Sequence, residues 1–96
     1  MDDIMIRSIR HKGLLRFFVH DDHRGIPARF AQRILRMLDR LDQCARPEDM
    51  DIPGYKFHAL KGGRQGMYAI NVSANWRLTF RFEDEDAVDV NLEDYH

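Results

Sequence analysis

Cysteine, proline and long apolar runs are all scarce in this 96-residue chain. Its single cysteine, Cys44, has no partner for an internal disulfide, which excludes the disulfide-stapled class of small secreted domains and agrees with a reducing compartment. No apolar run approaches the roughly 18 residues that span a bilayer, and the opening MDDIMIRSIRHK is too charged for a secretory signal. We therefore expect a cytoplasmic protein with no membrane partner.

The composition is that of a folded globule, with 44% apolar and 32% charged residues. The length suits one domain with a modest core and leaves no room for a second catalytic domain. We predict a single domain over residues 1–96.

The charges are segregated along the chain although they nearly cancel, at a net −1. Residues 52–82 contain five basic side chains and no acidic one, whereas residues 83–94 contain seven acidic side chains and no basic one. A basic sector can bind an anion such as nucleic acid, and a solvated strand face is the simpler interpretation.

Apolar periodicity predicts helices in the first half of the chain. Isoleucines at 4, 6 and 9 indicate a short N-terminal strand, residues 14–19 a short helix, and Pro27 the start of a second helix. The second helix places five residues on one apolar face: Phe30, Ile34, Met37, Leu38 and Leu41. Arginines at 29, 33, 36 and 40 form a stripe beside that face, which is either a solvated flank or a docking surface.

Beyond Pro53 the apolar period changes to two, which predicts four strands. Their apolar residues are Tyr55 and Phe57, then Tyr68, Ile70 and Val72, then Trp76, Leu78, Phe80 and Phe82, and finally Val88, Val90 and Leu92. The links KGGRQG, SAN and EDED are short enough for hairpins, so we expect an α+β fold whose mostly antiparallel sheet carries the helices on one face. The other face would then present His58, Arg77, Arg81 and Asn91 and lead to the C-terminal Tyr95 and His96.

One long stretch has a motif pattern of its own, KFHALKGGRQGMYAINVSANWRLTFRFEDEDAVDVNLEDYH. It resembles the C-terminal half of the HigB toxins of the RelE/ParE superfamily, and the opening MIRSIRHKGLLRFF is similar to the start of those toxins. The resemblance implies a RelE-like fold and a ribosome-dependent mRNA endonuclease that inhibits translation. It also implies a cognate HigA-type helix-turn-helix antitoxin, through which alone the protein would reach an operator DNA.

Metal-independent RNA cleavage needs a base for the ribose 2′-OH, cations for the charge developing on phosphorus, and an acid for the leaving 5′-oxygen. Because RNA supplies its own nucleophile, we expect no metal and no cofactor. Imidazole titrates near pH 6.5, so histidines are suitable proton carriers.

The resemblance places functional positions at His58, Asp94, Tyr95 and His96. We assign acid and base work to His58 and His96 without deciding which does which, and Asp94 would orient an imidazole. Tyr95 would stack on a base or orient the 2′-OH. Arg77 completes the predicted catalytic set because a guanidinium can hold two phosphate oxygens. Lys61 and Arg64 would steer the RNA backbone, and Asn75 would contact a base or make a turn.

Each assignment has a simpler alternative without the resemblance. His58 would be a hydrogen-bonded strand residue, Arg77 a solvent-facing one, and the last two residues a frayed tail. The segment HDDH at 20–23 offers only a weak metal-ligand pattern. Two other functions also remain open: an inhibitor of DNA gyrase from the same superfamily, and a non-catalytic regulatory module that binds only its antitoxin and DNA.

Overall fold

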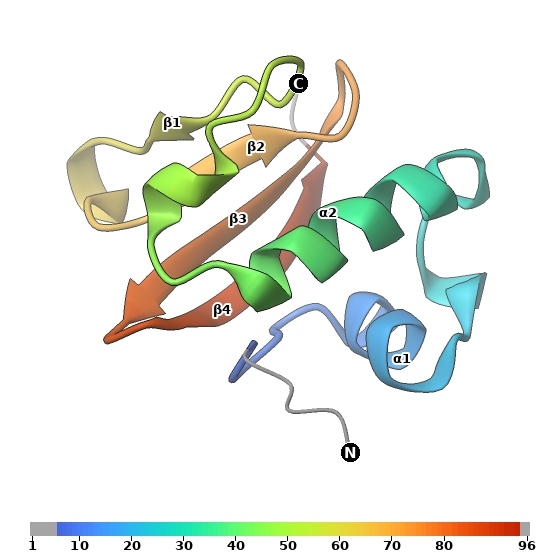
Figure 1. Cartoon of the computed structure of the whole chain (residues 1–96). Helices are drawn as coiled ribbons and strands as arrows, with labels where there is room; N and C mark the ends of the chain where they lie inside the picture. The colour runs from blue at the N-terminus through green and yellow to red at the C-terminus, as the bar shows by residue number, and fades with distance from the viewer. Residues whose placement is uncertain (1–5, 95–96) are drawn as a thin grey trace.

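The computed structural model describes residues 6–94, so Ile4 of the predicted N-terminal strand and the pair Tyr95 and His96 lie outside the described residues. Two helices precede a four-stranded antiparallel sheet whose order is β1-β2-β3-β4 (Figure 1). The helices are α1 (Lys12–His20) and α2 (Ala31–Gln43). The strands are β1 (His58–Ala59), β2 (Tyr68–Asn71), β3 (Trp76–Glu83) and β4 (Asp86–Asp94). The predicted α+β class is confirmed.

Both helices are bounded by local chemistry. The His11 ring accepts a hydrogen bond from the Leu14 amide and caps α1, and Asp21 ends the helix in the left-handed conformation at φ 57°. Pro27 does not open α2 as predicted: it precedes a 3-10 turn, Ala28–Phe30, and α2 begins after that turn. The predicted apolar face of α2 is correct, because Ile34, Met37, Leu38 and Leu41 are buried in it.

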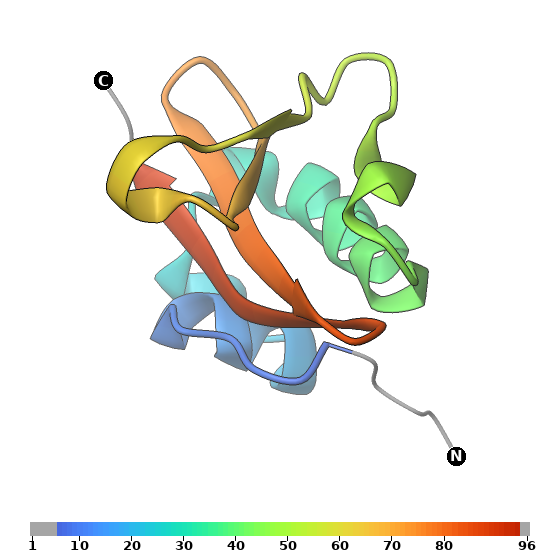
Figure 2. The same ribbon diagram turned by 90° about the vertical axis from the view of Figure 1, so that its left-hand side faces the viewer.

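α2 lies in front of the sheet in Figure 1, and one core joins it to the inward side chains of the strands, among them Ile70, Leu78, Phe80 and Leu92. The opposite side of the sheet, turned to the left in Figure 2, carries the alternate residues. We call this second surface the outer face: His58, Ala69, Asn71, Arg77, Thr79, Arg81, Asn91 and Glu93.

Two predicted strands are shorter than expected: the one around Tyr55 and Phe57, and the N-terminal one. Tyr55 and Phe57 pack on the core from outside β1, because Gly54 and Lys56 adopt φ angles of 92° and 52° that interrupt an extended chain. At the other edge, the N-terminal segment makes two isolated parallel bridges to β4, Ile6 with Ala87 and Ile9 with Val90. The sheet is thus bordered by irregular chain on both edges.

β4 contains a β-bulge that the sequence pattern did not predict. Thr79 pairs with Asn91 but Arg81 pairs with Val88, so β4 has one residue more than β3 between these pairs. Asp89, within the extra segment, has a φ of 53°. The bulge shifts the alternation, so Ala87 rather than Val88 joins Val90 and Leu92 in the core.

α1 is held against the following turn by direct backbone contact. A Cβ atom on Gly13 would lie 2.3 Å from the carbonyl oxygen of Gly25, and one on Gly25 would lie 2.6 Å from the Gly13 Cα. This contact lets α1 place Leu14 and Phe17 in the core.

Candidate active site on the outer face

The strand register places three of the predicted outer-face residues, His58, Arg77 and Asn91, in two adjacent rows of the outer face. The first row crosses all four strands and consists of His58, Ala69, Thr79 and Asn91. The second row crosses β2, β3 and β4 and consists of Asn71, Arg77 and Glu93. Neighbouring strands are about 4.8 Å apart, so the backbones of His58 and Thr79 are separated by about 10 Å. An RNA segment of a few nucleotides can cover both rows.

His58 is exposed on the short edge strand β1. Its ring Nδ1 lies 2.9 Å from the backbone carbonyl oxygen of Lys56. A carbonyl oxygen can only accept, so Nδ1 carries the proton and, in the neutral ring, Nε2 keeps a free lone pair. The left-handed backbone of Lys56 belongs to the same short segment, and the contact fixes the ring of His58.

Arg77 and Glu93 lie side by side on β3 and β4, where their side chains are 14% and 18% exposed. The Arg77 guanidinium is 3.6 Å from a Glu93 carboxylate oxygen. Thr79, which is fully buried, donates its hydroxyl to Glu93 at 2.7 Å. Arg64 donates two hydrogen bonds to the same carboxylate, one at 2.9 Å and one shorter. Glu93 is thus the centre of a cluster formed by Arg64, Arg77, Thr79 and Glu93, here called the Glu93 cluster.

The charges of the Glu93 cluster stabilise one another. Hydrogen bonding from the Arg64 guanidinium, with a further contribution from Thr79, lowers the pKa of Glu93 from 4.5 to about 2. The same contact raises the pKa of Arg64 above its ordinary value. The carboxylate therefore stays ionised throughout the physiological pH range.

The remaining predicted RNA-binding residues lie at the periphery. Lys61 is exposed and lines a hollow of about 560 Å³ between the β1-β2 connection and Tyr68. Asn75 is exposed in the β2-β3 hairpin, where its backbone N–H donates to the Ser73 hydroxyl at 3.3 Å. That contact is typical of a turn residue.

At the C-terminal end, Asp94 is exposed and pairs with Trp76, one residue before Arg77 on β3. The described end of β4 therefore lies beside the Glu93 cluster. Tyr95 and His96 follow Asp94 in the sequence and lie outside the described residues.

Three residues of this surface were missed by sequence reasoning: Lys56, Thr79 and Glu93. Thr79 and Glu93 share the period of Arg77 and Asn91, which was a usable signal. No sequence signal indicated the contact of Arg64 with Glu93, since 29 residues separate the two in the chain.

The second half of the outer face carries a different set of ion pairs. Arg81 donates to Asp89 and to Glu83, each at 3.0 Å, and its side chain is 36% exposed. Arg7 of the N-terminal segment lies 3.4 Å from Glu83 and 3.5 Å from Asp86. Acidic residues of 83–94 thus pair with the three arginines of the segment 52–82, Arg64, Arg77 and Arg81, from which the sequence alone predicted a basic sector.

Other candidate groups are used structurally. The Asp22 carboxylate of the HDDH segment pairs with Arg24 at 2.9 Å, a hydrogen bond that lowers the pKa of the aspartate. Within residues 6–94, no three histidine, cysteine or carboxylate side chains gather in a metal-binding group. Cys44 is buried, and this burial raises the pKa of its thiol, the opposite of what a nucleophile requires. In the described part of the chain, no helix is both long and apolar enough to cross a bilayer.

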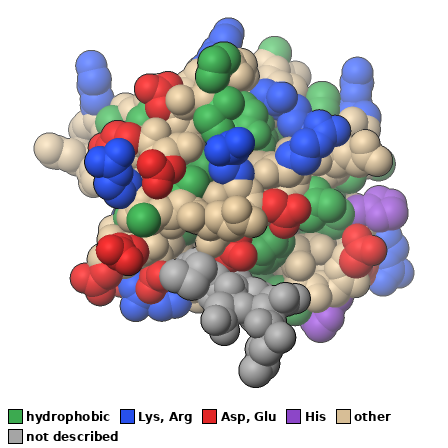
Figure 3. Space-filling model, in the orientation of Figure 1, with side chains coloured by type: hydrophobic (Ala, Val, Ile, Leu, Met, Phe, Trp, Pro, Cys, Tyr) green, Lys and Arg blue, Asp and Glu red, His purple; other side chains and the backbone are tan. Residues whose placement is uncertain are grey.

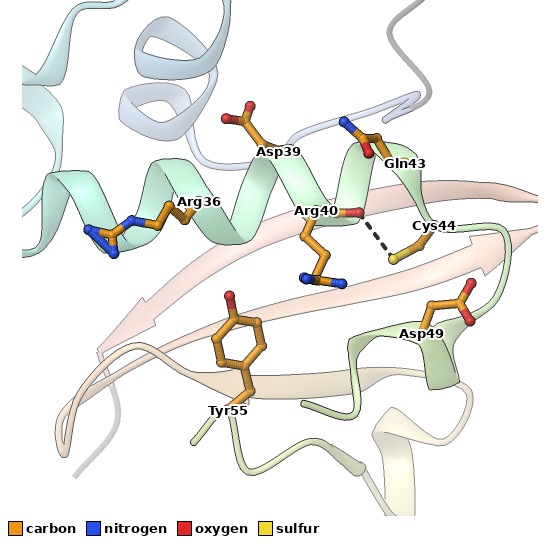
Figure 4. A pocket seen from close by; sticks show the side chains of 7 residues that line it. All are labelled: Arg36, Asp39, Arg40, Gln43, Cys44, Asp49 and Tyr55. Atoms are coloured by element: carbon orange, nitrogen blue, oxygen red, sulfur yellow. Dashed lines mark hydrogen bonds between the residues drawn. The ribbon is translucent and has the colours of Figure 1, made fainter. Parts of the chain in front are cut away.

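The helix side of the molecule displays acidic, basic and apolar side chains together (Figure 3). A hollow of about 620 Å³ lies between α2 and the segment leading to Tyr55. Arg36 and Arg40 belong to α2. The Arg40 guanidinium and the Tyr55 hydroxyl point into the space between α2 and the segment that carries Tyr55 (Figure 4). Asp49 closes the far end.

The arginine stripe of α2 is not uniform. Arg33 folds inward and donates to the backbone carbonyls of Val72, Gly54 and Asn71 at 2.8 to 3.1 Å. Its guanidinium also lies over the Tyr55 ring at 5.4 Å from the centroid. Arg33 therefore fixes α2 to the sheet, and Arg36 and Arg40 remain exposed.

A family model described as the RelE-like toxin of the type II toxin–antitoxin system HigB matches residues 7–96. Endoribonuclease HigB of Proteus vulgaris is 42% identical over 92 residues, which are 96% of this chain and 100% of that protein. Toxin HigB-1 of Vibrio cholerae serotype O1 is 32% identical over 91 residues, covering 93% of this chain and 96% of that protein.

Two solved structures have a similar fold. A copper-bound mutant toxin from Helicobacter pylori has a TM-score of 0.54 at 14% identity and covers 96% of this chain and 94% of that chain. YafQ from E. coli has a TM-score of 0.51 at 17% identity and covers 92% of each chain. At these identities the similarity concerns the fold alone.

Proposed function

Since the chain belongs to the HigB family of RelE-like toxins of type II toxin–antitoxin systems, we propose that it inhibits translation by cutting mRNA on the ribosome. Its identity of 42% to the Proteus endoribonuclease, along nearly the whole chain, makes it an endoribonuclease toxin. The observation that carries the proposal is the meeting of an exposed imidazole and a carboxylate-bound arginine on one sheet face. We place its site of action in the cytoplasm, where ribosomes and mRNA are.

His58 is proposed as the base that takes the proton from the ribose 2′-OH. Its Nδ1 is engaged by the Lys56 carbonyl, which leaves Nε2 as the proton acceptor in the neutral ring. His96 is then the acid that protonates the leaving 5′-oxygen, and Asp94 orients one of the two imidazoles. Tyr95 stacks on a base or orients the 2′-OH.

Arg77 is proposed to bind the scissile phosphate, because a guanidinium offers two parallel donors to phosphate oxygens and never loses its charge. Lys61 steers the neighbouring backbone, and Asn75 contacts a base. These roles need no metal and no cofactor, because the nucleophile belongs to the RNA.

The charges of the outer face support dependence on the ribosome. Arg64, Arg77 and Arg81 are all paired with carboxylates of β4, so the outer face has little excess positive charge with which to hold RNA. We infer that the ribosome supplies most of the substrate positioning and that naked RNA is cut poorly.

The test of the nuclease mechanism is mapping of cleavage sites on translating ribosomes, followed by single-turnover cleavage of ribosome-bound mRNA across pH. We expect His58→Ala, His96→Gln and deletion of Tyr95 and His96 each to lower the rate by a factor on the order of a hundred or more. His23→Ala, an exposed histidine at another place in the fold, is the matched control and should cut at the wild-type rate.

Cleavage by the truncated protein at the wild-type rate would disprove the role of the terminal pair. Inhibition of gyrase supercoiling by a protein that cuts no mRNA would identify the alternative toxin class. Equal rates with and without ribosomes would disprove only the dependence on the ribosome.

We further propose that a HigA-type helix-turn-helix antitoxin neutralises the toxin and that operator DNA is reached only through that complex. Arg36 and Arg40 line the hollow beside α2 together with Asp39 and Asp49, and the two guanidinium groups are the ones that an acidic antitoxin segment would contact. Arg36→Glu should weaken antitoxin binding in titration calorimetry and leave Tm unchanged. Arg33→Glu should lower Tm because it removes three hydrogen bonds to backbone carbonyls. Unchanged affinity of Arg36→Glu would remove the hollow from the interface.

A further inference from the structure

Arg64 lies in the connection between β1 and β2, yet its guanidinium is bound on β4. Both of its terminal nitrogens donate to the two carboxylate oxygens of Glu93. Such a two-point contact uses the planar geometry of both groups and fixes their relative orientation. Both terminal nitrogens of Arg64, the residue that sequence analysis assigned to RNA, are therefore already bound to protein.

Glu93 is bound on several sides at once. Besides Arg64, it accepts the Thr79 hydroxyl at 2.7 Å and faces the Arg77 guanidinium at 3.6 Å. A carboxylate has about four acceptor positions, so these partners restrict its rotation strongly. Thr79 is fully buried and belongs to the paired part of β3. Its hydrogen bond therefore holds the Glu93 carboxylate in a fixed position relative to the centre of the sheet.

The net charge of this group suits one phosphodiester. Arg64 and Arg77 contribute two positive charges and Glu93 one negative charge, which leaves one positive charge for one phosphate group. If Arg64 moved to the RNA, Glu93 would lose its closest cation while remaining mostly buried.

We propose that Arg64, Thr79 and Glu93 are positioning residues that hold the Arg77 guanidinium in place, and that Arg64 itself makes no contact with RNA. This inference rests on the proposed function, in which Arg77 binds the scissile phosphate. It reassigns Arg64 from RNA binding to support of Arg77.

The experiment is a double-mutant cycle on the full chain with Arg64→Ala, Glu93→Gln and the double variant, and with Arg81→Ala as the matched control. Single-turnover cleavage and binding of ribosome-bound mRNA are measured at several salt concentrations. Each single variant should cut about tenfold more slowly, and the double variant no more than about twofold more slowly than the worse single one.

Salt dependence distinguishes a positioning arginine from one that binds phosphate. Loss of one phosphate contact lowers the slope of log affinity against log salt by about one, whereas loss of a positioning residue leaves it unchanged. Arg64→Lys keeps the charge and loses the two-point geometry, so it should keep wild-type affinity and recover only part of the rate.

Additive losses in the cycle together with a reduced salt slope in Arg64→Ala would overturn the inference and return Arg64 to the RNA. Absence of cleavage by the wild-type protein would overturn the proposed function instead. Thermal unfolding of every variant is followed in parallel. If Arg64→Ala does not fold, Arg64→Lys and Arg64→Gln carry the same cycle with Glu93→Gln.

Discussion

The two ends of the outer face both consist of arginines bound to carboxylates, and they differ in burial. In the Glu93 cluster, the side chains of Glu93 and Arg77 are 18% and 14% exposed, Arg64 at its rim is 38% exposed, and the pKa of Glu93 falls to about 2. At the other end, Arg81, Glu83 and Asp89 are 36%, 50% and 39% exposed. Solvent and salt screen exposed pairs, so equal counts of ion pairs do not mean equal contributions. The mostly buried carboxylate of the Glu93 cluster is therefore expected to hold its partners more firmly than the exposed carboxylates at the other end.

The largest expected difference between the two ends is in cleavage. Arg77→Ala should lower the rate for ribosome-bound mRNA by a factor on the order of a hundred or more, and Arg77→Lys should restore part of it. Arg81→Ala should cut within about twofold of wild type, because Arg81 supports no proposed catalytic group. Loss of the cooperative thermal transition in Arg77→Ala would mean that Arg77 is structural and would withdraw its assignment.

Acid stability is the second difference. The folded pKa of Glu93 lies below its ordinary value of 4.5, at about 2, so its contribution to stability is complete above pH 4.5. As the pH falls from 4.5 towards 2, the unfolded state takes up a proton that folded Glu93 does not, so the unfolded state is favoured and on the order of 3 kcal/mol of stability is lost. Chemical denaturation between pH 6 and pH 2 should show this loss in wild type.

Glu93→Gln is the variant that isolates this contribution, since Asp22, whose pKa is also lowered, is present in both proteins. The difference in unfolding free energy between wild type and Glu93→Gln should shrink as the pH falls. A difference that stays constant from pH 6 to pH 2 would contradict the lowered pKa of Glu93.

Removal of one hydrogen bond within the Glu93 cluster gives a smaller effect. Thr79→Val keeps the shape of the buried side chain and removes the donor that Glu93 accepts at 2.7 Å. We expect a loss of about 1 to 2 kcal/mol in urea unfolding, since hydrogen bonds to charged groups contribute about this much. Thr79→Ser, which keeps the hydroxyl, separates the hydrogen bond from the packing of the methyl group.

The smallest expected effect is on stability at the exposed end. Arg81→Ala should change Tm by no more than about 2 °C, and by less at high salt, because exposed pairs contribute little. A larger fall in Tm would show that burial is the wrong criterion for ranking the two ends.

Patterns of short range in the sequence predicted the fold well. The apolar face of α2 and the antiparallel strands follow from periods of 3.6 and two, and the same alternation placed Arg77 and Asn91 on one face. Hydrogen bonds between distant residues could not be read in this way. Arg33 binds backbone carbonyls up to 39 residues away, and the bulge at Asp89 shifts the alternation by a residue.

The candidate site was predicted in part for the same reason. His58 and Arg77 could be placed because strand pairing is regular, and the motifs resemble those of a known family. The pairing of the arginines of this segment with carboxylates could not be predicted, since it depends on which carboxylates of β4 face which arginines. Sequence charge alone therefore overstated the excess positive charge of this surface.

The contact between Gly13 and Gly25 has a consequence for genetics. Because backbone meets backbone there, no neighbouring side chain can become smaller to accommodate a new Cβ atom, and α1 would have to move as a whole. Cells that survive expression of a toxin gene carry inactivating mutations of any kind, and substitutions at these two glycines should be frequent among them. Such survivors would identify positions that the fold requires, outside the proposed catalytic set, and would be mistaken for active-site mutants if activity were the only criterion.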